Sequence, residues 1–452
     1  MGDASACFKA YDIRGRVPGE LDADLARRIG LACAAEFRPE TVCVGRDVRL
    51  SGPALASALM DGLEEGGADV VDIGLCGSEE LYHAVFSGGF SGGVMVTASH
   101  NPADWNGMKI VRAGAAPVSG DSGLFAVRDR ALAGDLPRAR RRGRRRTASF
   151  RSEYAALLLS LLGEGGSNSL RPLRIVANAG NGCAWPALCA LLPALPGTII
   201  PLFERPDGAF PNGVPNPLLP ENRAATSRAV LEHKANLGVA WDGDFDRCFF
   251  FDEKGCFVES YYLVGLLAAD LLRSHPGARI LHDTRLIWNT REMAEEAGGI
   301  PLEGKTGHAF MKERMRRDDV LYGGEMSAHH YFRDFSCCDS GVLAWLLLWR
   351  IMSASGKSLS ALVGERIQRY PVSGEINRSV ADARAVRERV QKHFEHDALA
   401  VTHLDGLSMD MGAWRFNLRS SNTEPLLRLN VESRGDRALM EKKRDELMEL
   451  MC

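Results

Sequence analysis

Short apolar runs that break into small or polar residues recur along this chain and predict buried strands. In one of them the apolar residues 94–96 are followed by the loop Thr-Ala-Ser-His-Asn-Pro. A continuous apolar run is typical of a buried strand, and the Asn-Pro pair excludes a helix directly after it. We therefore expect Ser99 to lie at the tip of a strand, beside His100, with its hydroxyl exposed to a substrate.

Such runs alternate with segments of helical periodicity. Apolar residues followed by glycine occur at 41–45, 70–74 and 174–180. Between 53 and 67, leucines stand four positions apart, a proline opens the segment and two glycines close it. That arrangement predicts a helix. Strands that alternate with helices indicate layered α/β domains.

Acidic residues separate another pair of apolar runs. Asp242, Asp244 and Asp246 alternate between the run before 241 and the run after 247. Carboxylates in a tight loop suit a hard divalent cation with oxygen ligands, Mg²⁺ above all. A calcium-binding EF-hand would need glycine at the sixth position, where this loop has Arg247. The alternative is a solvated acidic turn, which the apolar flanks disfavour because an unpaired buried charge is costly.

Two further polar loops carry groups suited to binding. Glu325, Ser327 and His329 offer a carboxylate, a hydroxyl and an imidazole, which suit sugar hydroxyls. Arg419 and Arg428 offer guanidinium groups, which are strong partners of a phosphate dianion. Taken separately, each loop is equally compatible with a polar surface loop or a capped helix start.

Length and charge narrow the function classes. The chain has 452 residues, about three to four domains' worth. Its net charge of −3 and pI near 6.4 give no electrostatic reason to expect nucleic acid or a membrane surface as partner. The apolar run at 342–349 stops at Arg350, short of the roughly 20 residues that span a membrane. No leader pattern is present, and Ala6 breaks a myristoylation motif, so we expect a cytoplasmic protein.

The 11 cysteines show no metal or redox spacing. Cys337 and Cys338 are adjacent, without the two-residue gap of such motifs. The cysteines inside apolar segments are expected to be small buried hydrophobic residues. These are Cys43, Cys76, Cys189 and Cys248.

A run of arginines at 138–146 marks the clearest domain boundary. No aromatic residues interleave with it and the rest of the chain is balanced in charge, which disfavours nucleic-acid binding. A solvated connector or exposed edge is the favoured interpretation. Further boundaries are expected near Gly255 and near residues 369–371.

These motifs, in this order, resemble the α-D-phosphohexomutase family and, within it, the bacterial phosphomannomutase branch. The stretch 324–334 is similar to the mannose branch, which serves GDP-mannose synthesis for surface polysaccharides. The resemblance covers nearly the whole chain, through residues 8–15, 44–47, 101–109, 305–308 and 428–433.

The resemblance implies an α/β fold of four domains around a central cleft. Three are similar mixed α/β domains, and the fourth is a smaller, separately mobile α+β domain. The expected ranges are 1–149 with the phosphoserine loop, 150–255 with the metal loop, 256–369 with the sugar loop and 370–452 with the phosphate loop.

The activity implied is the reversible conversion of mannose 6-phosphate and mannose 1-phosphate through a phosphoserine and a 1,6-bisphosphate. Ser99 would carry the phosphoryl group and, with Asp242, Asp244 and Asp246, complete the Mg²⁺ site. The catalytic residues implied are Ser99, Arg14, His100, Lys109, Arg247 and His308, with Lys109 or His308 as the base. The substrate-binding residues implied are Tyr11, Arg285, Lys305, Glu325, Ser327, His329, Arg419, Ser421, Asn422, Thr423 and Arg428.

The resemblance further implies glucose or mannose 1,6-bisphosphate as activator, hexose phosphates as the small-molecule partners, and a monomer or weak dimer. Two departures matter. Ala328 stands where many relatives have glycine, although the mannose branch also accepts alanine, so the hexose preference stays open. Residues 78–80 (Ser-Glu-Glu) replace a Thr-Pro pair and have no assigned role.

Other function classes remain in view. A phosphoglucomutase, a dual-specificity phosphohexomutase or a phosphoglucosamine mutase would use the same machinery with different loop contacts. A metal-dependent sugar phosphatase would not need the distal phosphate loop. A non-catalytic sugar-phosphate binder could dispense with Ser99 or the aspartates, all of which are present.

Overall fold

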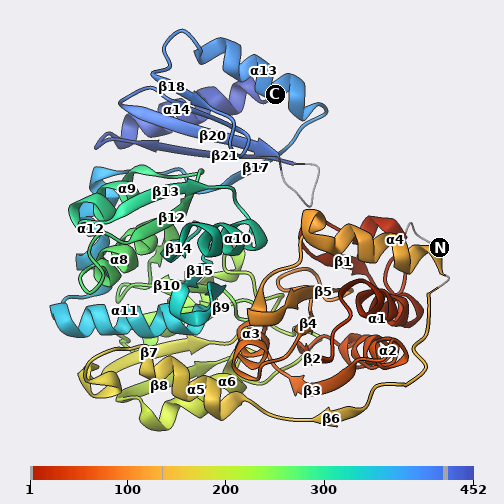
Figure 1. Ribbon diagram of the computed structural model, residues 1–452. Coiled ribbons are helices and arrows are strands. Elements are labelled where there is room, and N and C mark those ends of the chain that lie inside the picture. Colours follow the sequence, from red (N-terminus) through yellow and green to blue (C-terminus); the bar gives the residue numbers. More distant parts are fainter. Residues whose placement is uncertain (1–3, 135, 421–425) are drawn as a thin grey trace. The chain divides into compact units, whose positions relative to one another are not determined.

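The computed structural model (Figure 1) describes residues 4–134, 136–420 and 426–452. It divides into two compact units. The first unit comprises Met1–Phe257 and Tyr331–Gly356, and the second comprises Val258–His330 and Lys357–Cys452. The described residues form four sheets. Three contain parallel strands and the C-terminal one is antiparallel, which confirms the expected four-domain α/β fold.

The first unit begins with a mixed sheet. Its strands are β1 (Ile13–Arg16), β2 (Thr41–Arg46), β3 (Asp69–Leu75), β4 (Gly92–Val96), β5 (Trp105–Arg112) and β6 (Arg145–Thr147), and its helices are α1 (Ala23–Phe37), α2 (Gly52–Glu65), α3 (Ser78–Ser87) and α4 (Phe125–Ala133). The strand order is β1-β5-β4-β2-β3-β6. Parallel neighbours need helical crossovers, whereas the antiparallel step from β4 to β5 needs only a loop. That loop contains Ser99, as the apolar pattern predicts.

Local sequence explains the first two helices. Asp22 caps α1 by accepting a hydrogen bond from the Leu25 N–H at 2.8 Å. The predicted helix at 53–67 is α2. A Cβ atom at Gly62 would lie 1.9 Å from the Arg27 carbonyl oxygen, so the absence of a side chain there lets α1 and α2 pack closely.

The second sheet of the first unit holds the acidic loop. Its elements are β7 (Leu173–Asn178), β8 (Gly197–Leu202), β9 (Leu237–Trp241), β10 (Cys248–Phe251) and β11 (Phe257–Val258), with α5 (Arg151–Ser160), α6 (Ala184–Leu191), α7 (Ala224–Glu232) and α11 (Gly341–Ser355). β9 and β10 are an antiparallel pair joined by residues 242–247, so the expected strand–loop–strand arrangement is confirmed. Trp241 packs edge to face on Trp345 of α11, with 5.6 Å between the ring centroids. The apolar run at 342–349 is therefore a buried helix.

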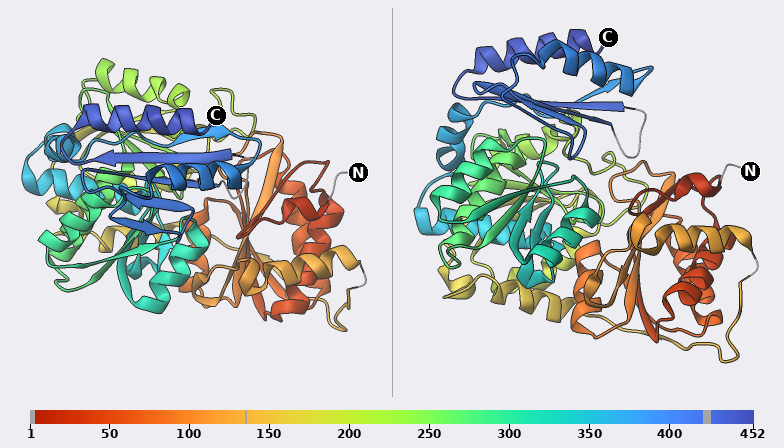
Figure 2. Two further views of the ribbon diagram at one scale, coloured as in Figure 1. Left: turned by 90° about the horizontal axis from the view of Figure 1, so that it is seen from above. Right: turned by 45° about the horizontal axis from the view of Figure 1, so that its top comes forward.

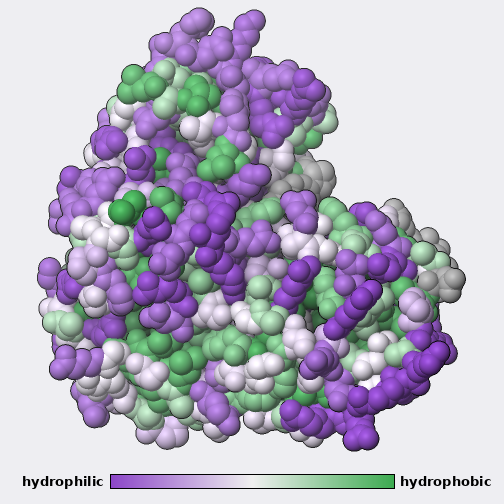
Figure 3. All heavy atoms as spheres, viewed as in Figure 1, coloured by the Kyte–Doolittle hydropathy of each residue, from purple (hydrophilic) through white to green (hydrophobic). Residues whose placement is uncertain are grey.

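The arginine run lies along the edge of the N-terminal sheet. Arg145 of β6 pairs in register with Val70 of β3. Arg142 and Arg145 both form ion pairs with Asp61 and Glu64 of α2. The surface near this segment is strongly hydrophilic on the face drawn in Figure 3. The interpretation as an exposed edge is confirmed.

The second unit combines a parallel sheet with an antiparallel one. The parallel part contains β12 (Arg279–Asp283), β13 (Ile300–Gly304) and β14 (Val320–Gly324), with α8 (Ser260–Leu272), α9 (Trp288–Glu296), α10 (His308–Asp318) and α12 (Leu359–Arg369). The antiparallel sheet contains β17 (Ile376–Ser379), β18 (Ala400–Thr402), β19 (Leu407–Asp410), β20 (Trp414–Ser420) and β21 (Leu426–Ser433), with α13 (Ala383–Phe394) and α14 (Arg437–Leu450). Figure 2 shows both of these helices on one face of that sheet.

A buried polar network ties the two sheets of the second unit together. The Glu432 carboxylate on β21 accepts from Arg415 Nη1 at 2.9 Å and from the Ile287 N–H at 2.8 Å. The Tyr261 hydroxyl donates to the same carboxylate. The buried Glu432 carboxylate keeps all of these hydrogen bonds only when α8, β20, β21 and the segment before α9 are arranged as observed.

Within the described residues, no helix is both long and apolar enough to cross a membrane. The cysteines of the described residues form no disulfide bond. Cys43, Cys76 and Cys248 are buried as predicted, but the prediction is wrong for Cys189, which is exposed. That position lies on the outer side of α6, whose inner side buries Leu188 and Leu191.

Candidate active site

A buried arginine holds the loop between β4 and β5. Arg49 Nη2 donates to the carbonyl oxygens of Ser99 at 2.9 Å and Asn101 at 2.6 Å. Its Nη1 donates to the carbonyl oxygens of Pro102 in the loop and Trp105 at the start of β5. Asp47 lies 3.2 Å from Arg49 Nε and also accepts from the Thr97 hydroxyl at 2.6 Å. Four hydrogen bonds from one guanidinium thus fix a loop that forms no ladder of its own.

Ser99 itself has a left-handed backbone, with φ of 51°. This conformation costs a residue with a Cβ about 1–2 kcal/mol, and surrounding contacts must enforce it. The Ser99 N–H donates to Thr97 Oγ1 at 2.8 Å, and its hydroxyl donates to Asp242 Oδ2 at 2.9 Å and lies 3.1 Å from His100 Nδ1. Ser99 is only 2% exposed. The expectation of an exposed hydroxyl is wrong, because the side chain turns into the acidic loop.

The acidic loop forms a candidate metal centre. Asp242, Asp244 and Asp246 are buried and bring carboxylate oxygens within 4.8 Å of one another. Asp244 Oδ1 is buried without a hydrogen-bond partner among the described residues. Clustered acceptor oxygens of this kind fit a hard divalent cation. Burial raises the pKa of Asp242, and the nearby carboxylates of Asp246 and Asp244 also raise it. Arg247, whose Nε lies 2.9 Å from Asp242 Oδ2, acts to lower it.

Glycine is required where the acidic loop meets the serine loop. A Cβ atom at Gly243 would lie 2.6 Å from the Ser99 carbonyl oxygen, closer than real Cβ contacts. Phe245, two positions on, has a left-handed φ of 48°. These features let Asp242 reach the Ser99 hydroxyl.

Lys109 of β5 supplies the cation of the cluster. Its Nζ donates to Asp244 Oδ2 at 2.6 Å, to Asp246, and to the Ser78 hydroxyl at 3.1 Å. Burial disfavours the ammonium form, but Asp244 and Asp246 outweigh it and raise the pKa of Lys109 above its ordinary value. The structure therefore brings Lys109 to the acidic loop; its role as a base remains a prediction.

Arg14 reaches the serine loop from β1. Its Nη1 donates to Asn101 Oδ1 and its Nε to Asp12 Oδ2, each at 2.7 Å. Burial works against the charge, but Asp12 and Tyr11 raise the pKa of Arg14. A permanently charged guanidinium thus stands beside the loop that carries Ser99.

Residues 78–80 form a junction around the acidic loop. The Ser78 hydroxyl donates to the Asp244 carboxylate, and the Ser78 N–H donates to the Asp244 carbonyl oxygen at 3.0 Å. Glu79 accepts from the Val342 N–H at 3.2 Å, in the first turn of α11. Glu80 accepts from the first residue of α5 at 2.7 Å. Each side chain of the Ser-Glu-Glu segment thus positions a different neighbour, a role that the sequence did not reveal.

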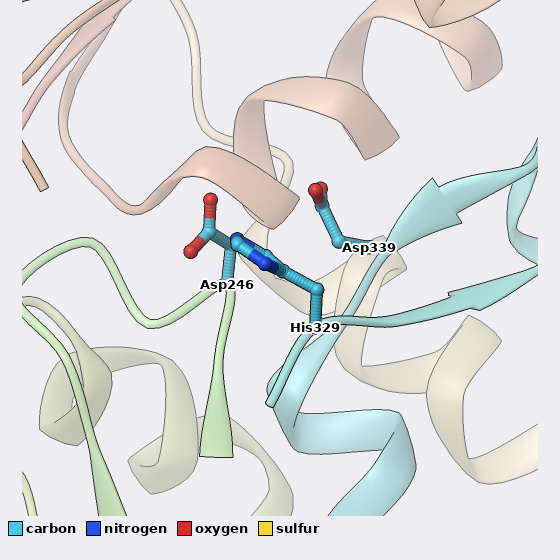
Figure 4. A group of neighbouring side chains, drawn as sticks. All are labelled: Asp246, His329 and Asp339. Carbon is cyan, nitrogen blue, oxygen red and sulfur yellow. The ribbon is translucent and has the colours of Figure 1, made fainter. Parts of the chain in front are cut away.

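Asp339 is a further acidic neighbour in the first unit. It belongs to β16 (Cys338–Asp339), which pairs with β15 (His330–Phe332). Its carboxylate comes within 4.8 Å of that of Asp246 (Figure 4). The third side chain labelled in Figure 4, His329, belongs to the second unit.

The sugar-loop candidates lie in a tight turn after β14. The Ala328 N–H donates to the Glu325 carbonyl oxygen, and the Glu325 N–H to that of His329, each at 3.0 Å. His329 Nδ1 lies 3.2 Å from Glu325 Oε2 and 3.4 Å from Ser327 Oγ. Ala328 has a left-handed φ of 72°, a conformation that glycine adopts at lower cost.

The start of α10 faces the same carboxylate. The Gly307 N–H donates to Glu325 Oε1 at 2.8 Å, directly before His308, the first residue of the helix. A carboxylate is stabilised at a helix N-terminus. His308 is buried beside this contact, whereas Lys305 is exposed with its Nζ 5.9 Å from the Phe310 ring centroid.

Arginines predicted to bind phosphate come together in the second unit. Arg419 of β20 and Arg428 of β21 lie opposite each other in register. Arg285 donates from Nη2 to Ser327 Oγ at 3.2 Å, which links this group to the sugar loop. Glu375 lies among the three guanidinium groups. The predicted ligands Ser421, Asn422 and Thr423 lie outside the described residues.

Sequence reasoning missed Arg49, Ser78 and Glu375. Arg49 follows the Gly-Arg-Asp motif at 45–47 by two residues, so proximity to that motif was the available signal. Ser78 lies in a segment noted for its departure from similar sequences. Glu375 is an isolated acidic residue, and no pattern in the sequence points to it.

Comparison with known proteins finds similarity along nearly the whole chain. Models described as phosphoglucomutase/phosphomannomutase alpha/beta/alpha domains I, II and III match residues 5–132, 153–255 and 259–370, and the C-terminal domain model matches 375–450. A phosphomannomutase of Salmonella typhimurium is 55% identical over 452 residues, covering 98% of each chain. A Xanthomonas campestris protein named for phosphohexose mutases is 55% identical over 444 residues, also covering 98% of each. A solved structure of a phosphoglucomutase/phosphomannomutase family protein from Burkholderia thailandensis has a TM-score of 0.88 at 32% identity, covering 99% of this chain and 97% of that one.

Proposed function

The chain belongs to the phosphoglucomutase/phosphomannomutase family, and we propose that it is a phosphomannomutase, an isomerase of carbohydrate metabolism. It interconverts mannose 6-phosphate and mannose 1-phosphate through a phosphoserine and a 1,6-bisphosphate. The observation that carries this proposal is the Ser99 hydroxyl 2.9 Å from Asp242, inside a cluster of three carboxylates. Whole-length identity of 55% to a relative named phosphomannomutase supports the mannose substrate.

The transfer step uses Ser99 as the phosphoryl carrier. The bond between Ser99 Oγ and phosphorus breaks as a bond forms between phosphorus and a sugar hydroxyl oxygen. The hydroxyl proton passes to a base, for which Lys109 and His308 are the candidates. In the second half of the cycle the other phosphate of the bisphosphate returns to Ser99. Arg14 and Arg247 steady the phosphoryl group, and His100 supports the Ser99 hydroxyl at 3.1 Å.

A divalent cation fits Asp242, Asp244 and Asp246, and we assign Mg²⁺ to it, with Ser99 completing the set of ligands. Bound there, it would neutralise charge that develops on the transferred phosphoryl group. Ser78 and Lys109 hold the Asp244 carboxylate in place. Glucose or mannose 1,6-bisphosphate is the proposed activator, since it phosphorylates Ser99 directly.

The second group of residues serves the end of the same substrate that does not react. Glu325, Ser327 and His329 bind sugar hydroxyls. Phosphate contacts come from guanidinium groups, which bind dianions through paired N–H donors. The proposed phosphate and substrate ligands beyond the sugar loop are Tyr11, Arg285, Lys305, Arg419, Ser421, Asn422, Thr423 and Arg428.

The remaining assignments complete the proposal. The domains are 1–149, 150–255, 256–369 and 370–452. Hexose phosphates are the partners, with no role for nucleic acid or membranes, and the protein works in the cytoplasm as a monomer or weak dimer. Its product feeds GDP-mannose synthesis.

A dual-specificity phosphohexomutase is the second candidate. It is favoured by the family description, which names glucose and mannose mutases together, and by the Xanthomonas relative, whose name specifies no single hexose. Ala328 in the sugar loop leaves the hexose preference open.

Coupled assays with mannose 1-phosphate and glucose 1-phosphate as separate substrates test the proposal. We expect a higher kcat/KM with mannose 1-phosphate, and no turnover of either by Ser99→Ala. Equal values would support the dual-specificity enzyme. Release of inorganic phosphate without isomerisation would identify a phosphatase and refute both.

A further inference from the structure

A carboxylate stands in the middle of the predicted phosphate-binding arginines. Glu375, just before β17, lies 3.1 Å from Arg285 Nη1, 3.6 Å from Arg419 Nη2 and 3.3 Å from Arg428 Nη1. An anion at this place competes with the phosphate that the arginines are expected to bind. Its presence therefore calls for an explanation.

Charge and burial show how strongly these groups are coupled. The side chains of Arg285 and Arg419 are only 2% and 4% exposed, and that of Glu375 is 16% exposed. Burial opposes ionisation of Glu375, but Arg285, Arg428 and Arg419 outweigh it and lower its pKa. Burial and the charge of Arg285 lower the pKa of Arg419, while Glu375 acts in the opposite direction. Positive charge is thus crowded here, and Glu375 compensates part of it.

Glu375 is not needed to fix Arg285. Arg285 also pairs with Asp283, whose Oδ2 lies 2.6 Å from Nη2, and it donates to Ser327 Oγ at 3.2 Å. Asp283 is itself fixed, since it accepts from the Met326 N–H at 2.9 Å. The guanidinium therefore keeps partners when the Glu375 charge is removed.

We propose that Glu375 limits how tightly Arg285, Arg419 and Arg428 hold a phosphate dianion. The proposal rests on the proposed mutase cycle, in which the bisphosphate must leave this end and turn round between two transfers. Binding that is equally strong before and during the reaction does not raise kcat, and it slows any step that needs release. A carboxylate built into the cluster weakens the phosphate contact enough for release.

The test compares Glu375→Gln with the wild type in binding inorganic phosphate, measured by calorimetry at fixed ionic strength without divalent cations. Arg419→Ala identifies the binding that belongs to this cluster. Glu388→Gln is the matched control, because Glu388 also pairs with an arginine but is exposed on α13. We expect the Kd of Glu375→Gln to fall about tenfold, as removal of a nearby negative charge in a partly buried site should give, and that of Glu388→Gln to stay unchanged.

Mutase kinetics provide a second, separate measurement. We expect both KM and kcat of Glu375→Gln to fall, whereas a residue that merely shapes the site would raise KM. An unchanged or higher phosphate Kd in Glu375→Gln would overturn the proposal. If Glu375→Gln does not fold, Glu375→Ala replaces it with the same expectation, and failure of both to fold would show a structural role and also overturn it. Because phosphate binding needs no mutase activity, its outcome is independent of whether the proposed function holds.

Discussion

The Arg49 guanidinium donates a hydrogen bond to the Ser99 carbonyl oxygen at 2.9 Å, so a fully buried residue 50 positions earlier fixes the backbone of the proposed phosphoryl carrier. The same guanidinium pairs with Asp47, which in turn holds Thr97, and Thr97 Oγ1 accepts from the Ser99 N–H. The strained backbone of Ser99 is therefore held from both its N–H and its carbonyl. The backbone conformation of Ser99 thus depends on the buried side chains of Arg49 and Thr97.

Replacement of Arg49 tests this dependence. Arg49→Met leaves Asp47 buried without its ion pair, which should lower the free energy of unfolding by about 3–5 kcal/mol. It should also abolish Ser99 phosphorylation, since the loop loses its fixed conformation. Urea denaturation and phosphopeptide analysis measure the two effects. Arg27→Met, which breaks a partly exposed ion pair with Glu65, is the control, and equal effects of the two variants would contradict the account.

Ser78 should control the metal site through Asp244. Ser78→Ala removes a hydroxyl that donates to the Asp244 carboxylate and accepts from Lys109. Loss of such a supporting contact commonly costs about 10–100-fold in metal affinity. We expect weaker Mg²⁺ activation and weaker Mn²⁺ binding by calorimetry, with recovery in Ser78→Thr, which keeps the hydroxyl. Unchanged metal affinity in Ser78→Ala would show that the contact is incidental.

Two buried histidines should make the protein sensitive to mild acid. Burial lowers the pKa of His282 from 6.5 to about 4 and that of His330 from 6.5 to about 3. Both are neutral in the fold and become protonated in the unfolded chain below about pH 6.5. The unfolded state then binds more protons, so stability falls as pH decreases, by up to about 1.4 kcal/mol per pH unit for each histidine.

Urea denaturation between about pH 7 and pH 5 measures this slope. His330 contacts the Tyr322 hydroxyl at 2.6 Å, and His330→Gln keeps a polar partner for it. In His330→Gln, the slope of the unfolding free energy against pH should be smaller by the contribution of about one proton. In His393→Gln, at a half-exposed position on α13, the slope should be unchanged. A flat profile in the wild type would refute the assignment.

Arg419 should bind the phosphate that is not transferred. A charge-assisted contact of this kind contributes about 1.5–3 kcal/mol, so Arg419→Ala should lower kcat/KM at least about tenfold. Phosphorylation of Ser99 should survive, because Arg419 belongs to a separate group of residues. Unaltered kinetics, or loss of metal and phosphate at Ser99, would contradict the assignment of Arg419 to the phosphate that is not transferred.

The sequence predicted those parts of the site whose chemistry is concentrated in one loop. Asp242, Asp244 and Asp246 alternate between two apolar strands, and that local pattern sufficed to place a candidate cation there. Alternation of strands and helices likewise predicted the α/β layers. The contact of Ser99 with Asp242 joins loops from two different sheets, so it followed from family resemblance rather than from local pattern.

Other features depend on tertiary contacts that leave no local pattern. Arg49 donates to main-chain carbonyl oxygens, which every residue possesses. The sequence therefore contains no complementary side chain from which its partners could be predicted. Glu375 can be recognised only from its contacts with three arginines that are far apart in the sequence, two on strands and one in the bend after β12. The exposure expected for Ser99 was wrong because the strand-end position predicts a loop but not the direction of its side chain.

The phosphoserine is the central claim, and mass spectrometry of the purified protein tests it most directly. Intact mass after incubation with glucose 1,6-bisphosphate and Mg²⁺ should show one added phosphoryl group, which peptide analysis should locate at Ser99. Ser99→Ala should remain unmodified and inactive. A phosphoryl group on another residue, or full mutase turnover by Ser99→Ala without added bisphosphate, would contradict the account.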